Sequence, residues 1–122
     1  MKLWPGVITE KVLESKEFYC RVFDARVIYE GEDGWFVLLQ IGDSELGFMK
    51  PGLEYQASVF RSAFPGQGVW LAVEVDDVGT EHQRIQALNV PLAVELRDEP
   101  WGDRHFAVTD PNGVSVDVVQ RR

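Results

Sequence analysis

The sequence predicts an α+β fold built from two modules, each with the order strand, helix, strand, strand, strand. Three observations support this prediction. The 122-residue length suits one compact domain. The hydrophobic pattern indicates two helices among short strands, and their order repeats after a break in the middle of the chain. We expect a single domain with modules at about residues 1–54 and 69–122, joined by a connector at 55–68.

The first module begins with a short strand at Leu3–Thr9, in which Pro5 removes one backbone donor and argues against a fully bonded central strand. A helix is expected at Leu13–Phe23, because aromatic and aliphatic residues recur there at helical spacing. Asp-Gly and Gly-Asp turn pairs separate the strands that follow. These strands are Arg26–Glu30, Trp35–Ile41 and Ser44–Lys50.

The second module repeats this order after a connector that contains a short helical piece and ends at Pro65 and Gly66. Its helix lies within residues 76–90, with Asp77 or Thr80 near the cap and Asn89 at the end, where Asn tolerates left-handed backbone. The strands are Val69–Val75, Leu92–Leu96, Arg104–Thr109 and Ser115–Val119. Trp4 and Trp70 hold the same place in the two copies, and so do Glu45 and Asp117.

Composition excludes several classes of function. The formal net charge of −8 argues against a nucleic-acid groove, which needs a basic surface, and favours a cationic ligand over an anionic one. Cys20 is the one cysteine, so no disulfide can form within the chain. No stretch approaches the roughly 20 apolar residues of a membrane span, and the N-terminus lacks the apolar core of a signal peptide. We therefore expect a cytoplasmic protein that binds neither nucleic acid nor membrane.

Alternation along the strands separates a core face from an open face in the second module. Val116 and Val118 share the face of Leu71 and Val73, which should lie under a helix. The opposite face would hold Trp70, Ala72, Glu74, His105, Ala107 and Asp117. This mixture of indole, small side chains, carboxylates and histidine is typical of a ligand cleft rather than of a solvated sheet. We expect Asp117 to line that cleft.

Three stretches resemble the vicinal oxygen chelate superfamily, which includes glyoxalase I, extradiol dioxygenases and bleomycin-resistance proteins. They are "ESKEFYCRVF", "WLAVEVDDV" and "EPWGDRHFAVTDPNGVSVDVV". The Trp-Gly turn followed by Asp-Pro-x-Gly is most similar to the bleomycin-resistance group, whose members sequester a drug without chemistry. The resemblance implies two βαβββ modules that curl as a mixed sheet around a cleft, commonly in a homodimer.

The metal enzymes of this superfamily place ligands where this chain has Trp4, Glu45, Trp70 and Asp117. An indole has no lone pair free for a metal. Two carboxylates alone are too few ligands for a catalytic ion, which normally has three from the protein. We therefore expect no metal and no other cofactor. The alternative is a metal-dependent lyase or dioxygenase in which His105 completes a site with the two carboxylates.

The preferred hypothesis is a binding protein that holds a flat or cationic small molecule in this cleft, with antibiotic sequestration as its role. Indoles beside carboxylates suit such a guest through stacking and cation–π attraction. Structural interpretations stay open: the carboxylates could only meet water, the tryptophans could fill the core or a turn, and the histidine could lie at a strand edge. The candidate ligand-binding residues are Trp4, Glu45, Trp70, Trp101, His105 and Asp117.

Overall fold

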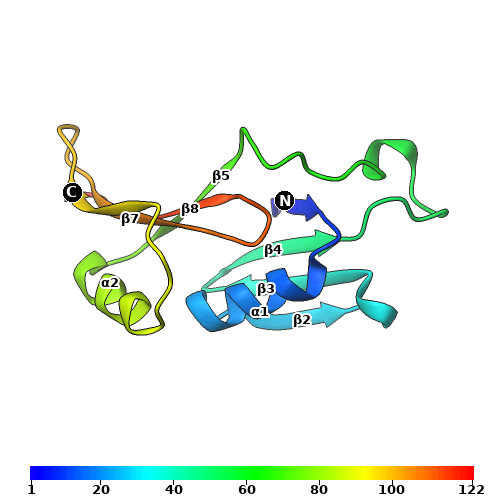
Figure 1. The fold of residues 1–122 in the computed structure, drawn as a ribbon, viewed down its shortest axis with the longest axis horizontal. Coiled ribbons are helices and arrows are strands. Elements are labelled where there is room, and N and C mark those ends of the chain that lie inside the picture. The colour runs from blue at the N-terminus through cyan, green and yellow to red at the C-terminus, as the bar shows by residue number, and fades with distance from the viewer. The chain divides into compact units, whose positions relative to one another are not determined.

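Two units, Met1–Pro65 and Gly66–Arg122, make up the computed structural model, which describes all 122 residues. Each unit contains a four-stranded mixed sheet and one helix longer than two turns (Figure 1). The order of elements in both units is β-α-β-β-β, so the predicted α+β fold with two βαβββ modules is confirmed. Neither helix is long and apolar enough to cross a membrane.

The first unit has its sheet in the order β1-β4-β3-β2, with β1 parallel to β4 and the other neighbours antiparallel. Its main elements are β1 Gly6–Ile8, α1 Val12–Phe23, β2 Arg26–Glu30, β3 Phe36–Ile41 and β4 Ser44–Met49. Two short 3-10 turns, η1 Glu32–Gly34 and η2 Ser58–Phe60, complete it. The first strand is shorter than the predicted Leu3–Thr9, because the residues before Gly6 lie outside the regular ladder.

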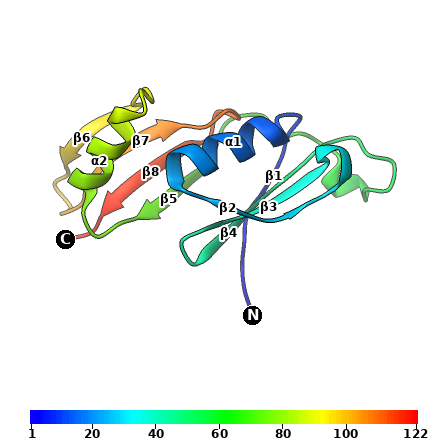
Figure 2. The same cartoon turned by 90° about the horizontal axis from the view of Figure 1, so that it is seen from below.

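Helix α1 covers one face of this sheet (Figure 2). Its apolar stripe includes Tyr19 and Val22, which are buried together with Phe48 of β4 and Val37 of β3. The Tyr19 and Phe48 rings lie 5.4 Å apart. The helix ends at Asp24, whose left-handed backbone at φ 55° lets the chain turn into β2.

The opposite face of the first sheet is partly covered by Trp4. Its indole lies over Gly47, and a Cβ added to Gly47 would stand 2.9 Å from the ring. Trp4 also meets Phe36 edge-on, with ring centroids 6.5 Å apart. Gly6, two residues after Trp4, stands opposite Gly47 in the β1–β4 pair. The absence of a side chain at Gly47 is therefore what lets the indole lie against the sheet.

Replacing Gly47 with alanine should displace the Trp4 ring, because the new methyl group occupies the space of the indole. We expect a red shift of tryptophan emission and a loss of about 1 kcal/mol or less in the free energy of unfolding, since Trp4 precedes β1 and is 40% exposed, outside the close-packed core. Gly6→Ala is the matched control: its Cβ would stand 4.0 Å from the same ring. Equal emission spectra for the two variants would contradict the packing.

Strand β2 is an outer edge of the first sheet, and all five of its residues are exposed. Three are apolar in sequence: Val27, Ile28 and Tyr29 are 44%, 47% and 53% exposed. The register with β3 shifts between Val27 and Tyr29, so the strand contains a bulge at this point.

The second unit repeats the topology, with the sheet order β5-β8-β7-β6 and β5 parallel to β8. Its elements are β5 Trp70–Glu74, α2 Val78–Ala87, β6 Val94–Asp98, β7 Arg104–Thr109 and β8 Ser115–Gln120. Strand β6 begins two residues later than the predicted Leu92–Leu96. The Ala93 backbone N–H donates to the Ala107 carbonyl at 2.7 Å, and the ladder starts with Val94 opposite Ala107, before a register shift.

Helix α2 begins at an N-cap on Asp77, whose carboxylate accepts a hydrogen bond from the Thr80 backbone N–H at 3.1 Å. Asn89 follows the helix with φ 59°, as expected for Asn in a left-handed position. The helix side of the sheet is the core: Val116, Val118 and Phe106 are at most 1% exposed. The predicted core face is confirmed.

One predicted equivalence between the modules is wrong. In the second unit Ala72 stands opposite Asp117 and lies two residues after Trp70, just as Gly6 lies two residues after Trp4. The tryptophans therefore hold equivalent places, but Asp117 corresponds to Gly47 and not to Glu45. Counting along the sequence missed this, because loop lengths differ between the copies and only the strand register fixes which residues face each other.

Candidate ligand-binding site

Asp117 lies in the middle of β8 on the face turned away from α2. Its direct neighbours across the sheet are Ala72 of β5 and Ala107 of β7. Because alanine side chains are short, neither neighbour shields the carboxylate, and the Asp117 side chain is 26% exposed. The open face of the second sheet thus presents the Asp117 carboxylate between small residues, as the alternation predicts.

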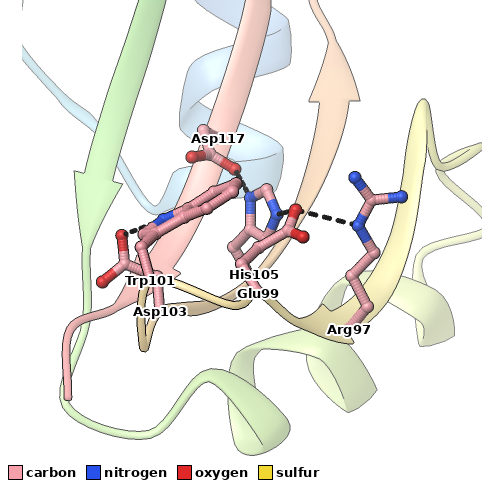
Figure 3. A network of polar contacts seen from close by, with 6 residues as sticks. All are labelled: Arg97, Glu99, Trp101, Asp103, His105 and Asp117. Carbon is pink, nitrogen blue, oxygen red and sulfur yellow. Dashed lines mark hydrogen bonds and ion pairs between the residues drawn. The ribbon is translucent and has the colours of Figure 1, made fainter.

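The imidazole of His105 lies between two carboxylates (Figure 3). Its Nδ1 is 2.6 Å from Oδ1 of Asp117, and its Nε2 is 2.8 Å from Oε2 of Glu99. The His105 side chain is 14% exposed and that of Glu99 is 9% exposed. An ionised carboxylate can only accept, so both ring nitrogens donate and the ring is an imidazolium in this arrangement.

The surroundings shift two pKa values in the directions that stabilise this pair. Burial lowers the pKa of His105, but hydrogen bonds to Asp117 and Glu99 and the charges of both carboxylates outweigh it, so the pKa is raised. The hydrogen bond from His105 lowers the pKa of Glu99; burial opposes it, and Arg97 adds to the lowering. The result is a charged ring held by two charged carboxylates.

The turn between β6 and β7 brings Glu99 to the histidine. Its backbone N–H donates to the Asp103 carbonyl at 2.8 Å, and Gly102, with φ 107°, donates to the Glu99 carbonyl at 3.0 Å. Arg97 Nε donates to Oε2 of Glu99 at 2.9 Å. At the tip of the turn Trp101 Nε1 donates to Oδ2 of Asp103 at 3.1 Å (Figure 3). The turn is therefore fixed by its own polar contacts.

The tryptophans named from the sequence do not fill the core. Trp70 is 69% exposed, Trp101 is 68% exposed and Trp4 is 40% exposed. Trp70 begins β5 opposite Ser115, two residues along the strand from the Ala72–Asp117 pair and on the same face of the sheet. Exposing an apolar indole ring to water is unfavourable, and exposed tryptophans are typical of surfaces that bind a ligand or a partner.

Glu45 belongs to the first unit, on the same open face as Trp4. Its side chain is 15% exposed and forms an ion pair with Lys2. The structure therefore places Trp70, Trp101, His105 and Asp117 in the second unit, and Trp4 and Glu45 in the first. That all six line one cleft stays a prediction.

Sequence reasoning missed Glu99 and Arg97. The available signal was the turn itself: Pro100-Trp101-Gly102 folds the chain back and brings a carboxylate before it within reach of a histidine after it, although Arg97 is the residue directly opposite His105. Glu99 precedes His105 by six residues, with this turn between them. The residue types alone gave no preference for Glu99 over the nearby Asp98 and Asp103.

The donor set of the second unit fits a metal ion poorly. The two carboxylates lie at opposite edges of the imidazole, so one ion cannot bind His105 together with both of them. No group of three or more His, Cys, Asp or Glu side chains is arranged to hold a metal. The indoles of Trp4 and Trp70 have no lone pair to give to a metal.

Residues 4–118 match the Glyoxalase/Bleomycin resistance protein/Dioxygenase superfamily. The chain belongs to this superfamily. An uncharacterized protein of Mycobacterium bovis, Mb0911c, is 26% identical over 117 residues, which cover 91% of this chain and 77% of that protein.

Two solved structures show how widely this fold is used. A lactoylglutathione lyase from Agrobacterium tumefaciens superposes with a TM-score of 0.80 at 23% identity, over 98% of this chain and 92% of that one. TnmS3, an antibiotic binding protein from Streptomyces sp. CB03234, superposes with a TM-score of 0.72 at 18% identity, over 100% of this chain and 96% of that one. At these identities the likeness establishes the fold, and function has to be argued from the site.

Proposed function

We propose that this superfamily member is a small-molecule binding protein of the bleomycin-resistance type, which holds a flat or cationic ligand without transforming it. The observation that supports this most is the open face of the second sheet, where exposed Trp70 and the accessible carboxylate of Asp117 lie on neighbouring strands, two residues apart in register. An indole face attracts a flat cation by stacking and cation–π contact, and a carboxylate adds charge. Antibiotic sequestration is the biological role that fits such a site.

The proposal extends to the assembly and the setting of the protein. We propose a cytoplasmic homodimer that needs no cofactor. Apolar side chains of the first unit support a partner: Tyr55, Val59 and Phe60 are 70%, 76% and 53% exposed. A second copy would cover such residues.

The alternative is a metal-dependent lyase or dioxygenase, and the fold likeness to a lactoylglutathione lyase is what favours it. That chemistry needs a metal with three protein ligands, and the alternative takes His105 as one of them. His105 is engaged by carboxylates at both ring nitrogens, so it would have to abandon one hydrogen bond to bind an ion. The binding function therefore agrees better with the geometry.

Titration with N-methylquinolinium, a flat permanent cation, tests the proposed function. We expect saturable quenching of tryptophan fluorescence in the full chain. Trp70→Ala should weaken binding about fivefold, the equivalent of about 1 kcal/mol of lost cation–π contact. Trp35→Phe is the control, because Trp35 contacts Phe36 and Tyr55 in the first unit. Quenching that rises linearly without saturation would contradict a specific site.

A further inference from the structure

The carboxylate that the proposed ligand would meet already has a cationic partner. Oδ1 of Asp117 lies 2.6 Å from Nδ1 of His105, a short charge-assisted contact. Yet the Asp117 side chain is 26% exposed, and Ala72 beside it is exposed as well. A ligand ammonium or ring cation can therefore approach Asp117 from solvent, on the side that His105 does not occupy.

The charges around His105 balance only while the ring is protonated. The groups on the elements packed against it are Asp117 of β8, Arg97 of β6, Glu99 and Asp103 of the turn, and the Glu74–Arg121 ion pair at the ends of β5 and β8. Arg97, Glu99, the imidazolium and Asp117 sum to zero. Loss of the ring proton leaves this connected group with one net negative charge.

We propose that a cationic ligand group at Asp117 competes with the proton of His105, so that cation binding is coupled to proton release. The inference rests on the proposed function, because it takes Asp117 as the place where the cation binds. A neutral imidazole has one N–H, which Glu99 can accept at Nε2, and Asp117 is then free for the ligand. Glu99 is thus a positioning residue: it holds the ring after the exchange.

The direction of the pH dependence follows from the raised pKa of His105. Although burial opposes it, the two carboxylates raise this pKa above the ordinary value of 6.5. Below that value the ring is protonated. Its positive charge offsets the negative charge of Asp117 and repels a second cation. As the pH rises through the raised pKa, the ring becomes neutral and the negative charge at Asp117 becomes available. Cation affinity should therefore increase with pH in the window above 6.5.

Two flat probes of the same shape separate charge from stacking. N-methylquinolinium is cationic at every pH, and 1-methylnaphthalene is neutral at every pH. We would measure the affinity of both for the full chain by calorimetry at about pH 6 and about pH 9, on either side of the expected window. The cation should bind at least about fivefold tighter at the higher pH, which is a typical coupling between linked sites. The neutral probe should bind equally at both.

Two variants test the role of the histidine. His105→Gln keeps an amide donor for a carboxylate but cannot titrate, so its cation affinity should not change with pH. Glu99→Gln removes one carboxylate that raises the pKa of His105, so the midpoint of the pH dependence should move to lower pH. By reciprocity, N-methylquinolinium should lower the pKa of His105 in an imidazole NMR titration, with His82→Asn used to assign the two rings. Circular dichroism would verify that each variant is folded.

The possible failures are distinguishable. If both probes bind but the affinity of the cation is the same at both pH values, the proposed function stands and the proton coupling is wrong. A pH dependence that persists in His105→Gln would also overturn the coupling, because another group would then titrate. If neither probe binds at either pH, the proposed function itself fails and the coupling fails with it.

Discussion

Val116→Asp is expected to unfold the second unit. Val116 is 0% exposed, stands between Leu71 of β5 and Val108 of β7, and faces α2. A carboxylate there would have no partner, and burying it costs several kcal/mol, which is comparable to the whole stability of a small domain. We expect the variant to lose its cooperative thermal transition, followed by far-UV circular dichroism.

Ser115→Asp is the matched control for this prediction. Ser115 is the neighbouring residue on β8, points to the opposite face and is exposed. The same new charge should change the free energy of unfolding by about 0.5 kcal/mol or less there. If Val116→Asp melts like Ser115→Asp, the assignment of the two sheet faces is wrong.

Asp110→Ala should give the next largest loss of stability, about 2–3 kcal/mol. Asp110 is 5% exposed, and its Oδ1 accepts hydrogen bonds from the backbone N–H groups of Asn112 at 2.8 Å and Val114 at 2.9 Å. Alanine would leave both donors without this acceptor, and each unsatisfied buried donor costs about 1–3 kcal/mol, partly offset by water entering the turn. The midpoint of urea unfolding measures the loss.

Asp110→Asn separates the hydrogen bonds from the charge. An asparagine side chain keeps an oxygen that can accept from both backbone groups, so we expect a loss of about 1 kcal/mol or less. Equal losses for the alanine and asparagine variants would show that the turn depends on the charge and not on the two hydrogen bonds.

The same turn shows why much of this fold could be predicted from the sequence. The Asp-Pro-Asn-Gly stretch places a side-chain acceptor, a rigid φ and a residue free to adopt φ 83° at Gly113 in the order that a tight turn requires. Asp77 and Asn89 act in the same local way at the two ends of α2. Such signals need only the neighbouring residues, so reading them requires no knowledge of the rest of the chain.

Non-local pairings could not be predicted as well. Glu45 seemed equivalent to Asp117 until the register set Gly47 in that place, and the register depends on contacts between strands distant in sequence. The contact between His105 and Glu99 was missed for another reason: it spans only one turn, but the nearby Asp98 and Asp103 offered the same kind of side chain. The sequence indicated which residue types lie on the open face, but not which of them form hydrogen bonds with each other.

The bulge in β2 has a consequence for solubility. An outer strand with three exposed apolar residues in sequence would otherwise be a template for another chain, because its free N–H and C=O groups would match the spacing of an incoming strand. The register shift between Val27 and Tyr29 interrupts that spacing. A partner strand could then pair with only one half of β2 at a time, which is too short to start an amyloid-like stack. The bulge thus reduces the tendency of this edge strand to aggregate, which its exposed apolar side chains would otherwise promote.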